Sequence, residues 1–257
     1  MLMKRKLSIA AVATLLPALL LYLWKMTYSF SDLAAFWMLC LAGMIFLGNW
    51  KIVIDHWQAE RGIILRPESW LSRYFTGRIG AFISSALLVM GLVPALTWNA
   101  LTMSALEAVV IFVLAFVSAL LFLFAQAFLA RHMIPPFDRI FATGPSAWLV
   151  GLPFAGILLV VTWLTTKVPV FMFNASVSEA MTFGMQGLPE RRGLIAEVLA
   201  FAYAADGAKL WLVAQMREYQ LVTFLLNLDM GLFGFLAARA SVVITHFVET
   251  HYGGVDD

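Results

Sequence analysis

The chain has 257 residues, of which 62% are hydrophobic and only 12% are charged. A water-soluble domain cannot bury that much apolar surface, so the composition excludes a soluble protein and predicts a single integral membrane domain over residues 1–257. The formal net charge of +2 is too small to favour nucleic acid as a partner. The single cysteine, Cys40, excludes an intrachain disulfide.

Six stretches are each long and apolar enough to cross a bilayer, which takes about 20 residues of helix. Only helices satisfy their own backbone in lipid, so these stretches predict an all-α transmembrane bundle. The first stretch follows Lys4, Arg5 and Lys6 and resembles a signal peptide. It lacks a small-residue cleavage site, so we expect it to remain as the first span. The predicted spans are roughly 7–24, 31–50, 79–98, 105–130, 146–166 and 219–245.

Basic residues are unevenly distributed between the two sides of the predicted bundle. The N-terminal end and the connections 51–78 and 131–145 together hold ten lysines and arginines, whereas the short connections opposite hold only Lys25. Basic loops stay in the cytoplasm, so both termini are expected there. This bias predicts a multi-pass protein of a bacterial inner membrane.

The segment 167–218 is too charged for a plain span and too apolar for a solvated loop. It predicts an interfacial or re-entrant outer helix between the fifth and sixth spans. Small residues recur at helical spacing in this segment and in the last span, and such spacing lets helices approach closely in lipid. The approach could occur within one subunit or at an interface with other membrane-protein subunits or a second copy. These residues are Ala196, Ala200, Ala204, Ala208, Gly231, Gly234 and Ala238.

Ionisable residues form a candidate intramembrane polar site. Asp229 and Asn227 lie in the last predicted span, and such groups at membrane depth mark either a pathway or an inter-helix pair. Asp206 and Lys209 are three residues apart on the outer helix and could pair on one face. Lys209 and Arg217 are the candidate partners of Asp229.

The two basic connections, 51–78 and 131–145, also carry aromatic residues and a double proline. They could bind a cytoplasmic partner, or they could contact anionic lipid head groups. The candidate contact residues are Trp57, Arg66, Trp70, Arg73, Arg78, Pro135 and Pro136.

Catalytic motifs are missing from the sequence. No nucleophile elbow, zinc-protease motif, P-loop or dinucleotide fingerprint is present, so we expect no enzyme activity, cofactor or metal. Two small clusters contain histidine with acidic neighbours, one around His56 and one comprising His246, Glu249 and His251. We expect both at solvated helix ends rather than around a metal.

Three functions remain. The first is a non-catalytic subunit of a multi-protein envelope assembly, such as a secretion or conjugation machine, and it rests on the small-residue spacing and the contact-like loops. The alternative is a permease or channel subunit, suited to a lipid-like or apolar substrate and served by a separate ATPase. The third, a membrane enzyme that uses Asp206, Asp229 or His56, has the least support.

Overall fold

A computed structural model describes residues 2–64, 77–135, 137–165, 168–188, 193–216, 218–219, 224 and 227–252. These residues form helices and turns, and they contain no β-strand. The α-helices are α1 (Leu2–Thr27), α2 (Ala35–Ile64), α4 (Arg78–Thr102), α5 (Ala105–Leu129), α6 (Phe137–Thr165), α7 (Val177–Gln186), α8 (Leu194–Gln215) and α10 (Leu228–Tyr252). Two short 3-10 helices, η1 (Asp32–Ala34) and η2 (Val170–Phe173), precede α2 and α7.

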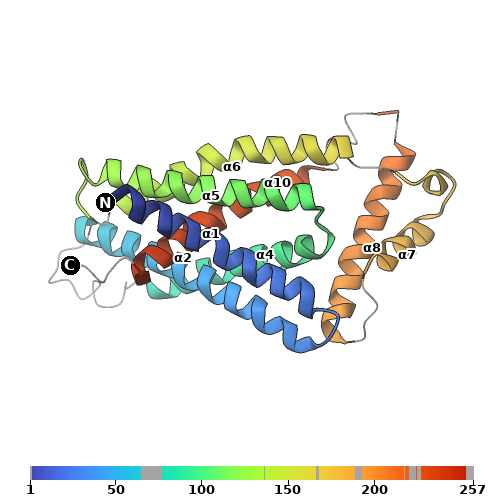
Figure 1. Cartoon of the computed structure of the whole chain (residues 1–257), viewed down its shortest axis with the longest axis horizontal. Coiled ribbons are helices and arrows are strands. Elements are labelled where there is room, and N and C mark those ends of the chain that lie inside the picture. Colours follow the sequence, from blue (N-terminus) through green and yellow to red (C-terminus); the bar gives the residue numbers. More distant parts are fainter. Residues whose placement is uncertain are drawn as a thin grey trace.

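Six of the described helices are long and apolar enough to cross a membrane: α1, α2, α4, α5, α6 and α10. They run side by side as one bundle, and α1 begins at the same end of the bundle at which α10 ends (Figure 1). The predicted all-α bundle of six spans is therefore confirmed, and the chain is described below as a multi-pass membrane protein.

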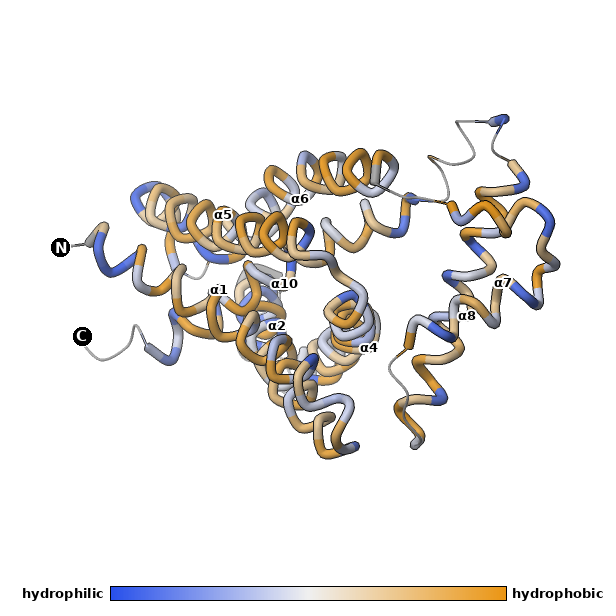
Figure 2. The backbone as a smooth tube through the Cα atoms, turned by 45° about the vertical axis from the view of Figure 1, so that its right-hand side comes forward, coloured by the Kyte–Doolittle hydropathy of each residue, from blue (hydrophilic) through white to orange (hydrophobic). Residues whose placement is uncertain are grey.

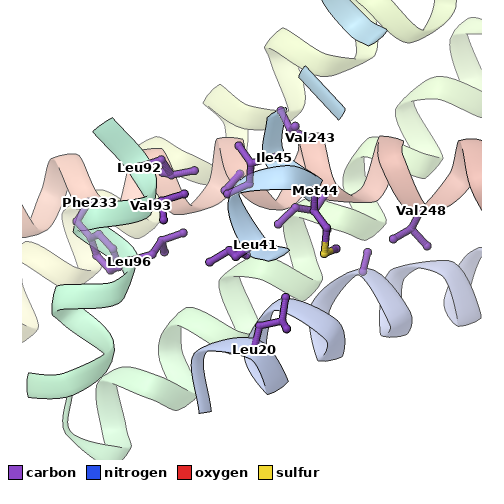
Figure 3. Packing of buried hydrophobic residues seen from close by; sticks show 13 residues of the cluster. Leu20, Leu41, Met44, Ile45, Leu92, Val93, Leu96, Phe233, Val243 and Val248 are labelled. Atoms are coloured by element: carbon purple, nitrogen blue, oxygen red, sulfur yellow. The ribbon is translucent and has the colours of Figure 1, made fainter. Parts of the chain in front are cut away.

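The last span, α10, is the centre of the bundle. Of its most apolar window, 72% of the residues are buried, whereas the other five spans bury about a third of theirs or less. Residues of α1, α2 and α4 pack on it in the largest apolar cluster, which includes Leu20, Ile45, Leu92 and Val243 (Figure 3). Because lipid covers the outer helices, α10 is the span that is solvated mainly by protein.

Small residues allow α10 to lie this close to its neighbours. A Cβ added to Gly48 of α2 would meet the backbone carbonyl of Val243, and one added to Gly234 would meet Leu158 and Ala155 of α6. Helix association in lipid depends on packing at such crossings rather than on a hydrophobic driving force.

The helices α7 and α8 form a separate unit at one end of the bundle. They pack on each other, and α8 runs across the bundle end rather than along it (Figures 1 and 2). A capping box starts α7, since the Ser176 amide donates to Glu179 Oε2 at 2.7 Å and the Glu179 amide donates to Ser176 Oγ at 3.3 Å. This placement agrees with the outer helix predicted between the fifth and sixth spans.

Three predicted spans have wrong boundaries. The second helix continues to Ile64 rather than ending near residue 50. The fifth helix begins at Phe137 rather than at 146, so most of the connection predicted over 131–145 is helical. The last helix occupies Leu228–Tyr252 rather than 219–245. Hydropathy follows apolar runs, such as the one before Asn227, and it stops at polar residues even where those residues are buried between helices.

Candidate functional site

A cavity of about 470 Å³ lies between the bundle end and α8. Residues of α4, α5, α6, α8 and α10 line it, so no two consecutive spans could form it alone. The volume falls within the range of small-molecule sites, roughly 300–1,000 Å³. Its polar lining residues include Asn99, Glu107, Asp206, Lys209, Asn227 and Asp229.

An ion pair joins α8 to α10 at the cavity. Lys209 Nζ lies 2.7 Å from both carboxylate oxygens of Asp229. The Lys209 side chain is 24% exposed and that of Asp229 is 51% exposed. Lys209 was one of the two partners expected for Asp229, while Arg217 lies outside the described residues. Asp229 lies in the first turn of α10, at the end of this span rather than in its middle.

A second contact holds the other end of α8. Leu199 packs with Trp24, Tyr28 and Ala34, which lie around the turn between α1 and α2. Trp24 is 1% exposed and its indole nitrogen donates to the Thr97 carbonyl at 3.1 Å, which fixes the aromatic support. The helix α8 therefore spans the bundle end between two attachments, with the cavity beneath it.

Asp206 contributes a carboxylate to the cavity from α8. Among the described residues it makes no hydrogen bond or ion pair of its own, since the neighbouring Lys209 is bonded to Asp229. Burial raises the pKa of Asp206 to about 6, Lys209 opposes that rise and Asp229 adds to it. The charge of Asp206 therefore changes near pH 6.

The cavity becomes apolar toward the middle of the bundle. From Asp229 to Leu236 the rise along α10 is about 10 Å, at about 1.5 Å per residue, and Leu232, Phe233 and Leu236 line this part. Leu232 is 61% exposed, so the apolar part is open at this position rather than enclosed. On α4, Gly91 lines the cavity, and a Cβ there would meet no atom within 4 Å. The site thus combines a charged end with an apolar part that is open at Leu232.

Comparison with protein families, curated proteins and solved structures finds no match. Function is therefore inferred from the site itself.

Most of the lining residues were not predicted from the sequence, among them three at helix ends: Trp98 and Asn99 of α4, and Glu107 of α5. They stand at helix ends, where polar and aromatic residues are ordinary. Glu107 also completes a capping box with Ser104, whose amide donates to Glu107 Oε2 at 2.9 Å. That local role gives no hint of a cavity, and only the long-range proximity of α5 to α8 and α10 could have revealed one.

The small residues of the predicted packing interface lie at crossings within the chain. Ala196 and Ala204 are 5% exposed, whereas Ala200 and Ala208 are half-buried. Gly231 and Gly234 approach Ala155 of α6, and Ala238 is fully buried near Gly151 of the same helix. The closest approach of α8 to α7 uses different residues, Gly207 on α8 and Ala180 and Gly184 on α7.

The predicted cytoplasmic contact residues are only partly described. Arg66, Trp70, Arg73 and Pro136 lie outside the described residues. Trp57 is 40% exposed on α2 and lies against Gly77. Arg78 and Pro135 are exposed.

His246 does not lie at a solvated helix end as the sequence suggested. It is 1% exposed within α10, and its ring stands edge-on to Phe122 at a centroid distance of 6.3 Å. Gln126 and Asp138 are also buried where α5 and α6 meet α10. Within the described ranges, no three histidine, cysteine or acidic side chains gather as metal ligands.

We expect Lys209 to be coupled more strongly to Asp229 than to Asp206. Alanine substitutions of Lys209 and Asp229, made singly and together, should show a coupling of about 0.5–1 kcal/mol, the magnitude of a partly exposed ion pair. The same cycle with Lys209 and Asp206 should give a smaller coupling. Both coupling energies are obtained from the free energy of local opening of α8, which amide hydrogen exchange measures in each variant. A larger coupling in the second cycle would contradict the observed pairing.

Proposed function

We propose that the chain is the substrate-binding subunit of a permease, and that it binds a lipid-like or apolar molecule in the cavity beneath α8. The observation that supports this is an apolar cavity that is open at Leu232, a residue of a membrane span, and whose far end carries charged groups. An amphipathic molecule could enter from the bilayer with its apolar chain in the apolar part of the cavity. Its polar end would then lie beneath α8. A hydrophilic solute would find no comparable fit, since the apolar cluster of Leu92, Leu96 and Phe233 lies next to the cavity.

We place this protein in a bacterial inner membrane with both termini in the cytoplasm. Two observations support this orientation. The connections predicted on the cytoplasmic side carry the excess of basic residues, and α1 begins at the same end of the bundle at which α10 ends. The cavity then faces the outer side of the membrane. Because the sequence holds no nucleotide-binding motif, the energy for transport would come from an ion gradient or from a separate ATPase.

A cavity-filling variant tests the proposal. Gly91→Leu places a side chain in the cavity where a Cβ meets no atom, so we expect the protein to fold normally and to lose the bound molecule. Native mass spectrometry of the purified protein, titrated with membrane phospholipid, should show at least one bound lipid fewer per chain than the unsubstituted protein.

The matched control is Gly156→Leu on α6. This glycine is also exposed and free of atoms within 4 Å, but it does not line the cavity. The Gly156→Leu variant should bind as many lipids as the unsubstituted protein. Equal lipid binding by the Gly91 and Gly156 variants would overturn the proposed function.

A non-catalytic subunit of an envelope assembly is the second candidate. The supporting observation is an apolar stripe on α8, on the side opposite α7, where Leu194, Val198 and Phe201 are 74%, 65% and 78% exposed. The buried small residues no longer argue for a partner, since they pack within the chain. The bilayer could also cover this stripe, because α8 lies at the bundle end.

Affinity purification in mild detergent separates the two candidates. Under the assembly hypothesis, specific protein chains co-purify, and Phe201→Ser releases them. Ala204→Leu is a poorer probe because Ala204 is buried and its substitution would disturb α8 itself. A chain that purifies alone in both forms would contradict the assembly hypothesis.

A further inference from the structure

We propose that the charged end of the cavity binds a positively charged amine, so that the ligand is an amphipathic cation with an apolar chain. This inference rests on the proposed function, because it specifies the ligand of the same cavity. It follows from the balance of charges around the cavity, from the bonds that those charges already make, and from an aromatic donor on the wall.

The charges around the cavity are mainly negative. Three carboxylates line it, from Glu107, Asp206 and Asp229, whereas among the described residues a single ammonium group, that of Lys209, opposes them. A cleft with apolar walls and one dominant sign of charge attracts ligands of the opposite sign. The expected ligand is therefore a cation rather than a phosphate or a fatty acid.

The existing bonds identify the carboxylate that is available. The Lys209 ammonium contacts both oxygens of Asp229, so the two charges offset each other and both carboxylate oxygens already have a partner. Glu107 is held by the amide and hydroxyl of Ser104, each at 2.9 Å. Asp206 alone of the three makes no such bond to any described residue, and it projects from the helix that crosses the cavity. An ammonium group of a ligand would pair with Asp206.

Trp98 provides an independent indication that the ligand carries a polar group at this end of the cavity. It lines the cavity, and its indole nitrogen is buried without an acceptor among the described residues. A buried donor without an acceptor costs about 1–3 kcal/mol, so a rotation of this side chain that turns the donor toward a ligand oxygen in the cavity would be favourable. Indole rings also attract cations across their faces. The head group thus combines an amine with a hydrogen-bond acceptor.

Binding of a cation should depend on pH through Asp206. Burial raises the pKa of this carboxyl to about 6. The groups around it are Tyr203 and Lys209 on α8, Asp229 on α10 and Glu107 on α5, and burial raises the pKa of Tyr203 to about 12, so its phenol stays neutral. As the pH rises through 6, Asp206 loses its proton and the site gains a negative charge. Affinity for a permanent cation should therefore rise with pH.

The experiment compares two single-chain probes of equal length in an uncharged maltoside detergent. One is an alkyltrimethylammonium ion, whose charge does not titrate, and the other is the alcohol of the same chain. Dissociation constants are measured at pH 5 and pH 8 from tryptophan fluorescence. For one group with a pKa near 6, the cation should bind roughly tenfold more tightly at pH 8. The alcohol should bind equally at both.

Substitutions assign the effect. Asp206→Asn should bind the cation as weakly at pH 8 as the unsubstituted protein does at pH 5. Glu197→Gln removes a carboxylate from an exposed position of α8 outside the cavity and should keep the full pH dependence. If the Asp206 variant keeps the pH dependence, the inference is wrong.

The outcomes separate this inference from the proposed function. Equal affinity for the cation and the alcohol at both pH values would overturn the inference that the ligand carries an amine. The cavity would then remain a site for apolar chains. Failure of both probes to bind would overturn the proposed function as well. Competition by phosphatidylethanolamine would identify a membrane lipid as the source of the amine, and its failure to compete against a bound cation would identify a single-chain amphiphile.

Discussion

Gly48→Ala is expected to lower the thermal unfolding midpoint of the purified protein by several degrees. The added methyl group would meet the backbone carbonyl and the side chain of Val243 on α10, and a backbone atom cannot rotate away. Overpacking of this kind costs about 1–3 kcal/mol. The cost should be large here because α2 and α10 meet at the centre of the bundle, so the two helices must separate.

The matched control lies on the same helix. A Cβ at Gly43 would meet no atom within 4 Å, so Gly43→Ala adds a methyl group without a clash. Alanine also favours the helix over glycine by about 1 kcal/mol, so the midpoint should stay unchanged or rise. Equal midpoints for the two variants would show that the crossing of α2 with α10 does not limit stability.

The second large effect is expected at the crossing of α7 and α8. A Cβ at Gly207 would collide with the Ala180 carbonyl, and one at Gly184 would collide with the Tyr203 carbonyl. Gly207→Ala should therefore separate the two helices. Because α7 and α8 pack mainly on each other, the loss should appear as faster proteolysis within 168–216, with little change in the bundle.

Ala205→Leu is the control for this variant. Ala205 is exposed on the face of α8 that points away from α7, so a larger side chain there has room. Its proteolysis rate should match that of the unsubstituted protein. If both variants resist the protease equally, the close approach at Gly207 is not what joins α7 to α8.

Hydropathy was sufficient to predict the six spans, because crossing a bilayer imposes length and apolarity on each span separately. It was insufficient for the ends of α6 and α10. There, buried residues such as Asp138 and His246 are polar, and neighbouring helices rather than lipid surround them. A hydropathy average cannot distinguish these two environments.

The spacing of alanines on α8 predicted the right kind of contact, but the closest approach uses a glycine rather than one of these alanines. A repeat of four residues advances by about 40° per step on a helix of 3.6 residues per turn, so four alanines spread over a wide arc. Only part of that arc is buried, and the closest approach to α7 falls on Gly207. Lys209 was one of two predicted partners of Asp229, but the cavity was not predictable, since α4, α5 and α6 come together around this pair only in the folded chain.

The central position of α10 has a consequence for synthesis in the membrane. The helix that the others surround is the last of the six to leave the ribosome, so the five earlier spans must remain in the bilayer without their common partner. During that interval, the side chains that later pack on α10, including the close crossing at Gly48, face lipid. A chain released before α10 is complete would present these surfaces to quality-control proteases that survey the bilayer. The amount of mature protein in the cell should therefore depend on how quickly the final helix is inserted.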